Sequence, residues 1–309
     1  MTLSPREIAS DLLQEAEIRG KQYSVPAGLH SDDFIFWFIH DQAHMVDKRQ
    51  AVEDYFRSGQ EGAAFIRDLL KEWRPRLLLD ALQTPGQPLT MLEFASGYGR
   101  VTRHFPSVME DYKVTACDIH EQAVGFLRGM GLDAEQSSSV PEDLQLGRQF
   151  DVIYAFSFFT HMPRRTWQRW LAALGRHVKP GGLLLFSTHG RLSQEMMQVR
   201  ELEADGFFFR PASEQADLPV AEYGNTVTTF EFVAAQLQDM DLRIVQFREA
   251  GAGHHDFYIL QKYTEQAVHE PTEAQRLREQ IAQMHRSTSW SVTAPLRALG
   301  RALGRGSRP

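Results

Sequence analysis

A short stretch between residues 90 and 105 carries the residue types and spacing of a ligand-binding turn. It reads TMLEFASGYGRVTRHF, an apolar run that ends on Glu93, a turn of small residues and an amphipathic segment. Ala95, Gly97 and Gly99 occupy alternate positions of the turn, and their lack of bulk lets backbone N–H groups approach a ligand closely. The pattern predicts a strand, a tight turn and a helix start that bind a nucleotide-like ligand.

The spacing of the glycines distinguishes two kinds of nucleotide site. A dinucleotide site has the pattern G-x-G-x-x-G, but Thr102 stands where the third glycine is needed for close helix–strand packing. The run EFASGYG instead fits E-x-[GA]-x-G-x-G and resembles motif I of the class I S-adenosylmethionine-dependent methyltransferases. The resemblance implies S-adenosylmethionine as cofactor and S-adenosylhomocysteine as product, and a turn without a ligand is the alternative. The implied cofactor contacts in this run are Glu93, Ala95, Ser96, Gly97 and Gly99.

Later positions also match the cofactor site of that family. Asp118 ends the next β-rich run, 19 residues after Gly99, where the family places an acid that accepts hydrogen bonds from ribose hydroxyls. A weak third strand then leads into a serine run, in the region that lines the adenine in the family. By resemblance, further cofactor contacts are Asp118, Ile119, Ser137, Ser138 and Phe156.

Two more blocks follow in the order that the family has. Residues 150–157 are apolar throughout, as in a strand buried on both faces, and lead into FFTHMP, which resembles the block after motif III of small-molecule and glycan methyltransferases. Residues 171–187 resemble the family's helix, KPGG turn and apolar strand. The implied fold class is α/β, a Rossmann-like seven-stranded sheet of order 3-2-1-4-5-7-6 with the last strand antiparallel. The closing hairpin is expected at 242–247 and 256–261.

Histidines stand at the ends of several predicted strands. His161 follows the fourth strand, His189 follows the fifth, and His254, His255 and Asp256 precede the reversed last strand. All these positions meet at the carboxyl edge of the sheet, where the cleft of an open α/β sheet lies. Methyl transfer to a poorly acidic hydroxyl needs positioning and a base, and histidine suits that role.

We therefore expect His161, His189, His255 and Asp256 to be the catalytic residues, with packing or substrate-pocket roles as the alternative. Histidine and aspartate at strand ends can also bind a divalent metal. No tight ligand spacing demands one, so we expect none.

The first 80 residues predict helices, with a turn at 57–60 and a second helix that ends before Pro75. In many class I methyltransferases such a cap covers the cofactor, which makes Tyr55 and Gly59 candidate cofactor contacts. Three parts follow from these patterns: a helical cap at 1–80, a methyltransferase domain at 81–262 with a substrate-covering insertion at about 190–229, and a helical, basic amphipathic tail at 263–309.

The tail differs from the rest of the chain in charge. From residue 285 on it has five arginines and no acid, whereas the whole chain has a net charge of −7. A basic helix at 296–303 beside Trp290 can lie in an anionic membrane interface. Residues 287–297 also resemble a C-terminal element of bacterial glycosyltransferases and associated enzymes of surface-polysaccharide clusters. Partners expected for the tail are a membrane surface, a polysaccharide-assembly protein or a second copy of the chain.

Composition excludes several classes of protein. Charged residues make up 24% and apolar residues 42% of 309 residues, as in a globular protein, and the acidic balance argues against nucleic acid as substrate. Cys117 is the one cysteine, so no intramolecular disulfide forms. The first residues have no apolar signal-peptide core. We expect a cytoplasmic protein that can lie at the inner face of the cell membrane.

The sequence thus predicts an S-adenosylmethionine-dependent methyltransferase that O-methylates a sugar hydroxyl of a glycan or lipid-linked saccharide. Alternative acceptors are a small natural product or a carboxylate. A non-catalytic scaffold that binds the cofactor within a polysaccharide assembly complex is a second reading. A nicotinamide dehydrogenase is disfavoured by Thr102 and by the closing hairpin.

Overall fold

The computed structural model describes residues 6–43, 47–80, 87–212 and 219–263, so the predicted tail lies outside it from residue 264 on. The helices are α1 (Ser10–Tyr23), α2 (Phe34–Ala43), α3 (Lys48–Asp80), α4 (Phe105–Val108), α5 (Glu121–Gly129), α6 (Arg164–Arg176), α7 (Arg191–Met196) and α8 (Phe230–Gln236), with 3-10 turns η1 (Thr102–His104) and η2 (Pro141–Asp143). The strands are β1 (Leu89–Phe94), β2 (Tyr112–Asp118), β3 (Ala134–Gln136), β4 (Phe150–Ala155), β5 (Val178–His189), β6 (Phe207–Arg210), β7 (Asn225–Thr228), β8 (Leu242–Ala252) and β9 (His255–Lys262).

The described strands form one nine-stranded sheet whose main body has the predicted order. Neighbouring strands run β3-β2-β1-β4-β5-β9-β8, which matches the predicted 3-2-1-4-5-7-6 when the additional hairpin β6–β7 is not counted. The first five strands of this order pair in parallel, whereas β9 runs antiparallel to β5. The Rossmann-like α/β sheet with its reversed last strand is therefore confirmed.

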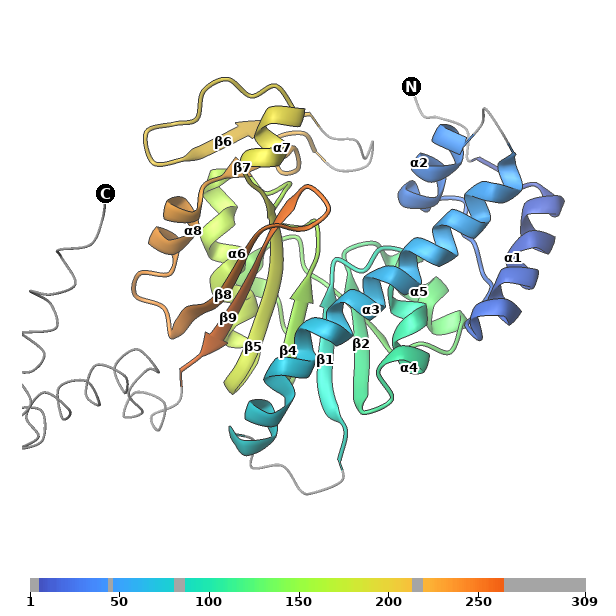
Figure 1. Cartoon of the computed structure of the whole chain (residues 1–309), viewed down its shortest axis with the longest axis horizontal. Helices are drawn as coiled ribbons and strands as arrows, with labels where there is room; N and C mark the ends of the chain where they lie inside the picture. Colours follow the sequence, from blue (N-terminus) through green and yellow to red (C-terminus); the bar gives the residue numbers. More distant parts are fainter. Residues whose placement is uncertain (1–5, 44–46, 81–86, 213–218, 264–309) are drawn as a thin grey trace, which may run out of the picture. The chain divides into compact units, whose positions relative to one another are not determined.

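Both faces of the sheet are buried because apolar side chains alternate along the central strands. Met91 and Leu183 belong to the core beneath α3 and α4, whereas Leu92 and Leu184 belong to the opposite core beneath α6 and α8. Figure 1 shows α3 passing in front of the parallel strands. Burial on both faces explains why these strands read as continuous apolar runs.

The N-terminal part contains one long helix where two were predicted. α3 runs without interruption through the predicted turn at 57–60 and through Pro75. Gly59 supports a close contact between elements: a Cβ there would clash with the carbonyl oxygen of Arg100. The glycine that suggested a turn is therefore a packing glycine within a helix.

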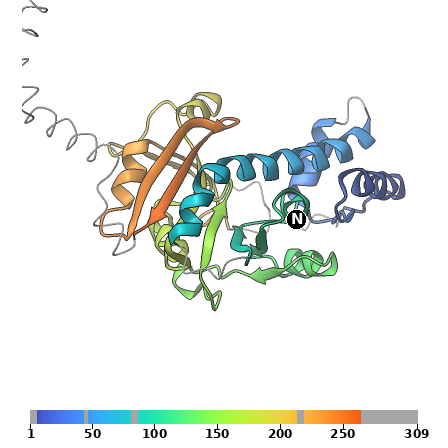
Figure 2. The same ribbon diagram turned by 60° about the horizontal axis from the view of Figure 1, so that its bottom comes forward.

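The two halves of α3 belong to different cores. Ile66 and Leu70 pack beneath the sheet, whereas Val52, Tyr55 and Phe56 form a separate core with α1 and α2. Figure 2 shows these N-terminal helices, in blue, gathered at one end of the described fold. α3 is thus shared between the cap helices and the sheet.

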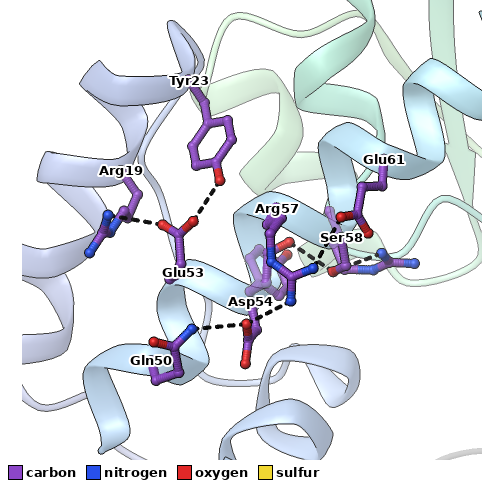
Figure 3. A network of polar contacts seen from close by, with 10 residues as sticks. Arg19, Tyr23, Gln50, Glu53, Asp54, Arg57, Ser58 and Glu61 are labelled. Carbon is purple, nitrogen blue, oxygen red and sulfur yellow. Dashed lines mark hydrogen bonds and ion pairs between the residues drawn. The ribbon is translucent and has the colours of Figure 1, made fainter.

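Polar contacts on the surface of the cap join α1 to α3. The Tyr23 hydroxyl donates to Glu53 at 2.7 Å, and Arg19 pairs with the same carboxylate at 3.0 Å (Figure 3). Arg57 bridges Asp54 and Glu61 along α3 at 2.8 and 3.0 Å. Because several of these charges are exposed, their ion pairs contribute little to the free energy of unfolding. Their main effect is to set how α1 and α3 align.

Two local expectations were wrong. The KPGG residues predicted as a turn belong to β5, whose register with β4 shifts between Phe150 and Val152, and Gly181 there has φ +79°. The segment after the glycine turn is the short η1 and a single turn of α4 in place of a regular helix. η1 contains a buried arginine, Arg103, whose contacts are described below.

The insertion predicted at 190–229 contains α7 and the hairpin β6–β7. β7 pairs with the end of β5 through Val227 and His189. On its other side, His189 pairs with His255 of β9. β7 therefore lies on the same side of β5 as β4, beyond the point where β4 ends. The Gly224 N–H donates to the His161 carbonyl at 3.0 Å, and the Thr226 N–H donates to the Thr160 carbonyl at 2.7 Å. The insertion is therefore anchored on the segment that follows β4.

Across the described ranges, none of the helices combines the length and the apolar character that crossing a membrane requires.

Candidate functional site

The turn after β1 has a left-handed backbone at its three small residues. Ala95, Gly97 and Gly99 have φ values of +58°, +56° and +76°. A Cβ at Gly99 would clash with Leu127 of α5, whereas a Cβ at Gly97 would meet no atom within 4 Å. Gly99 therefore serves close packing, and Gly97 leaves open space beside the backbone. Ala95 carries the strain of a non-glycine residue in the left-handed region.

Asp118, at the end of β2, organises this turn. Its Oδ2 accepts from the Gly97 N–H at 2.7 Å, and its Oδ1 accepts from the His120 N–H at 3.0 Å. The Ser96 N–H donates to the Cys117 carbonyl at 3.1 Å, while the buried Ser96 hydroxyl has no partner among the described residues. Cys117 is itself buried. An unpartnered buried hydroxyl is costly, and a bound polar ligand would satisfy it.

Glu93, the residue before the end of β1, is a buried carboxyl beside the same turn. The Thr102 hydroxyl donates to it at 2.5 Å. Burial raises the pKa of Glu93 to about 7, with Asp118 adding to the rise and Thr102 and Arg100 opposing it. Two acids buried at one turn favour a cationic ligand, which would stabilise their charged forms.

The residues predicted at the adenine lie together at the ends of β2 and β3. The Ser137 N–H donates to the Asp118 carbonyl at 2.8 Å. Ser138 Oγ accepts from the Val140 N–H at 3.0 Å, and the Ile119 carbonyl accepts from Gln136 at 3.3 Å. The structure thus places Ile119, Ser137 and Ser138 beside Asp118, at the edge of the sheet where the turn lies.

The predicted histidines form a second group at the end of β5. His189 pairs directly with His255 across the antiparallel β5–β9 ladder, and their ring centroids lie 4.9 Å apart. His161 lies 6.3 Å from His189 and stacks on Tyr223 at 4.3 Å. Phe156, predicted at the cofactor, lies 5.0 Å from the His255 ring and so belongs to this group.

These imidazoles are held neutral. Burial lowers the pKa of His161 and of His189 to about 4, and that of His255 to about 3, where the neighbouring His189 adds to the effect. His161 Nδ1 lies 2.7 Å from the Gly224 carbonyl, and His189 Nδ1 lies 3.0 Å from the Thr226 carbonyl. Because a carbonyl oxygen only accepts, Nδ1 carries the proton in both rings and Nε2 carries the lone pair.

Asp256 stands apart from the histidine rings in its contacts. Its Oδ1 accepts from the Ala250 N–H at 2.9 Å, and a Cβ at Gly190 would clash with its carboxylate. Burial raises the pKa of Asp256. These contacts tie the β8–β9 turn to the end of β5.

Residues 92–184 match a family described as methyltransferase domain, a segment that runs from the end of β1 into β5. Residues 92–184 are a class I S-adenosylmethionine-dependent methyltransferase domain. S-adenosylmethionine is its cofactor and S-adenosylhomocysteine its product.

A curated relative and solved structures accompany this match. The tRNA N(3)-methylcytidine methyltransferase of Schizosaccharomyces pombe is 28% identical over 173 residues, which cover 51% of this chain and 55% of the relative. The chain thus spans about half the length of that relative. A methyltransferase from Clostridium acetobutylicum (15% identity, TM-score 0.47, 72% of this chain and 98% of that one) and DesVI of Streptomyces venezuelae (15%, 0.47, 77% and 99%) are among similar structures. At these TM-scores they say nothing about the acceptor.

The residues of the methyltransferase domain fit the cofactor. The unpartnered Ser96 hydroxyl, the open space at Gly97 and the two buried acids Glu93 and Asp118 are what a polar, cationic molecule requires. Tyr55 is different. It is buried in the core of the cap, and its hydroxyl donates to Asp33 at 2.5 Å.

Arg103 connects Tyr55 to the glycine turn and was not predicted. The guanidinium is 1% exposed and donates to the carbonyls of Gly99 at 3.0 Å and Gly28 at 2.8 Å, with Tyr55 Oη at 3.5 Å. His30, in the same cap segment, stacks on Tyr98 with centroids 4.5 Å apart. The segment before α2 therefore lies against the turn. No local pattern in the sequence distinguishes Arg103, because Arg100, Thr102 and His104 around it are also polar.

Proposed function

We propose that the chain transfers the methyl group of S-adenosylmethionine to a sugar hydroxyl of a glycan or lipid-linked saccharide. The methyltransferase domain at residues 92–184 supports the transfer. One observation supports a hydroxyl acceptor: neutral imidazoles gather at the carboxyl end of β5, two strands from the glycine turn. An alcohol must lose its proton during methylation, and unprotonated imidazole nitrogens can take it.

On the cofactor side, bound S-adenosylmethionine supplies an electrophilic methyl group on a sulfonium. Gly97 admits the cofactor to the backbone of the turn, Ser96 offers it a hydroxyl, and the carboxyls of Glu93 and Asp118 complement its positive charge. Ile119, Ser137 and Ser138 extend this surface along the ends of β2 and β3. Arg103 holds Tyr55 and the cap against the turn, so Tyr55 and Gly59 position the site without entering it.

On the acceptor side, we assign His161 as the group that accepts the hydroxyl proton. Its Nδ1–H is committed to the Gly224 carbonyl, which leaves Nε2 to receive a proton. His189 and His255 share the cluster, and Asp256 holds the turn that carries His255. Phe156 and Tyr223 add aromatic surface beside these rings.

The composition supports a sugar over a nucleic acid. The net charge of −7 gives little attraction for a phosphate backbone, so we do not extend the tRNA acceptor of the S. pombe relative to this chain. The resemblance of residues 287–297 to polysaccharide enzymes supports a glycan. A membrane surface or an assembly partner at the tail, and the cytoplasmic face of the membrane as location, belong to the same proposal.

Cofactor binding is tested with two arginine substitutions at open, left-handed glycines. Gly97→Arg should abolish saturable S-adenosylmethionine binding in calorimetry, because the side chain fills the space at the turn. Gly147→Arg is the matched control, since Gly147 has φ +61° and no atom within 4 Å of its Cβ but lies before β4. Wild type without saturable binding, together with an unaffected Gly97→Arg variant, would refute the proposal.

The acceptor is tested by transfer of radioactive methyl to polysaccharide and lipid-linked saccharide fractions, followed by mass spectrometry of the product. His161→Asn keeps a donor to the Gly224 carbonyl but offers no basic nitrogen, so O-methylation of a sugar should fall by about 10²- to 10⁴-fold. A carboxylate acceptor needs no proton removed. Unchanged turnover in His161→Asn, or labelling confined to small acids, would exclude the sugar hydroxyl. Cofactor binding without any transfer would indicate the scaffold.

A further inference from the structure

Three histidines meet where β5 ends and the β8–β9 turn begins. His189 is the last residue of β5 and pairs in register with His255, the first residue of β9, while His254 precedes it in the turn. The ring centroids lie 4.9 Å apart for His189 and His255, 5.8 Å for His189 and His254, and 4.4 Å for His254 and His255. One ring nitrogen from each lies within 4.8 Å of the others. Three imidazoles therefore converge on one point from two strands.

The hydrogen bonds of the two buried rings leave nitrogen lone pairs available. His189 donates from Nδ1 to the Thr226 carbonyl at 3.0 Å, so its Nε2 is free to act as a ligand. A metal-bound histidine typically uses its second nitrogen in this way, which fixes the orientation of the ring. The buried His255 Nδ1 has no hydrogen-bond partner among the described residues. A coordinated ion would satisfy an atom that otherwise stays unpaired.

The third ring provides access. His254 is exposed, and it follows Gly253, whose φ is +64° and whose Cβ position has no atom within 4 Å. An ion can therefore enter from solvent. A tetrahedral zinc site with bonds of about 2.0–2.1 Å places its ligand nitrogens about 3.3 Å apart, closer than the 4.8 Å limit here. The exposed ring has the space to close that difference.

We propose that His189, His254 and His255 bind one divalent transition-metal ion, with zinc as the first choice. Imidazole ligands suit zinc, copper, nickel and cobalt better than magnesium or calcium, which prefer oxygen. Three histidines leave the fourth position of a tetrahedral ion open. The sequence alone led us to expect no metal, because no tight ligand spacing demanded one.

The site has a role in catalysis only if the proposed function holds. An ion at this point lies about 10 Å from the line of β1, two strand spacings away across β4. Its open position can polarise an acceptor hydroxyl and lower the pKa of that hydroxyl, while His161 takes the proton. Metal binding itself does not depend on methyl transfer.

The test is a zinc titration of the full chain after removal of metals with a chelator, by calorimetry and by metal analysis after dialysis. We expect one equivalent bound by wild type. His254→Ala should weaken binding at least tenfold, and because the ring is exposed the variant should fold. His189→Ala should weaken it equally, with circular dichroism reporting its fold. His30→Ala, a partly exposed histidine of the cap, is the control and should bind like wild type. Cobalt should give the absorption of a four-coordinate ion in wild type and in His30→Ala, but not in His254→Ala or His189→Ala.

Two results would overturn the proposal: no saturable binding by wild type, or binding that His254→Ala leaves intact, which would place the ion elsewhere among the 12 histidines. S-adenosylmethionine binding is measured on the same samples. If zinc binds and S-adenosylmethionine does not, the metal site stands and the proposed methyl transfer fails. If S-adenosylmethionine binds and zinc does not, the metal-site proposal fails and the proposed methyl transfer stands.

Discussion

The glycine turn and the histidine cluster lie at the same edge of one sheet but are built in opposite ways. The turn is formed by neighbouring residues whose backbone N–H groups and left-handed φ values define it, with Asp118 fixed to Gly97. The histidine cluster is formed by side chains from the end of β5, the segment after β4 and the β8–β9 turn. The glycine turn depends on local backbone conformation, whereas the histidine cluster depends on how distant elements pack. The comparison predicts that substitutions at the turn disturb folding and cofactor binding, whereas substitutions at the exposed part of the cluster do not.

Substitution of Arg103 should give the largest loss of stability among these predictions. Arg103→Met keeps much of the volume but leaves the carbonyls of Pro26 and Gly28 without the guanidinium that donates to them. A buried acceptor left without a donor costs about 1–3 kcal/mol, so the two carbonyls together should lower the free energy of unfolding, measured with urea, by about 2–6 kcal/mol. Arg169→Met, which breaks an exposed pair with Glu142, is the control and should cost less than about 1 kcal/mol. Equal losses in the two variants would show that Arg103 does not hold the turn.

Glu93 should make stability depend on pH. Its pKa is about 7 in the folded chain against 4.5 ordinarily, so between these values the folded state keeps a proton that the unfolded state has released. Stability contributed by this group therefore falls as pH rises from about 4.5 to about 7, by on the order of 3 kcal/mol at 1.36 kcal/mol per pKa unit. Glu93→Gln should abolish that fall in urea unfolding curves.

The exposed Glu121→Gln is the control for Glu93 and should keep the wild-type dependence. Saturating S-adenosylmethionine should flatten the wild-type dependence, because a cation beside Glu93 favours its carboxylate. A Glu93→Gln protein with the same slope as wild type would contradict the assignment.

Ala95 should give a smaller effect of the opposite sign. Ala95→Gly removes the strain of a non-glycine residue at φ +58° and should stabilise the chain by about 1 kcal/mol. Ala235→Gly, at an exposed position of the helix α8, should destabilise by about the same amount. In thermal unfolding, the melting temperature should rise for Ala95→Gly and fall for Ala235→Gly. A loss of stability at Ala95 would mean that its methyl makes contacts that outweigh the strain.

His254 should give the smallest effect on stability. The ring is exposed, so His254→Ala in metal-free protein should change the free energy of unfolding by less than about 0.5 kcal/mol. With zinc present the wild type should unfold at higher temperature and the variant should not. A large loss in metal-free protein would place the turn among the structural elements and weaken the contrast with the glycine turn.

This contrast also explains what could be predicted from the sequence. The turn residues, Asp118 and the strand order follow from short local patterns, because tight turns and buried strands restrict residue type at fixed spacing. The predicted break in α3 was wrong because Gly59 serves a contact with Arg100, which no local pattern shows. Arg103 and the grouping of His254 with His189 depend on packing between distant segments. For the same reason the position of Phe156 beside His255 could not be read from the sequence, and its contact with the cofactor stays a prediction.

The continuity of α3 has a mechanical consequence. A helix of 33 residues is about 50 Å long at 1.5 Å per residue, and it is anchored in the sheet core at one end and in the cap core at the other. It can act as a rigid lever. A tilt of about 5° around its middle would move the cap end by about 2 Å. Movement of the cap away from the glycine turn would therefore move the part of α3 that packs beneath β1 and β4. A ligand that restricts the motion of one end of α3 would also restrict the motion of the other end.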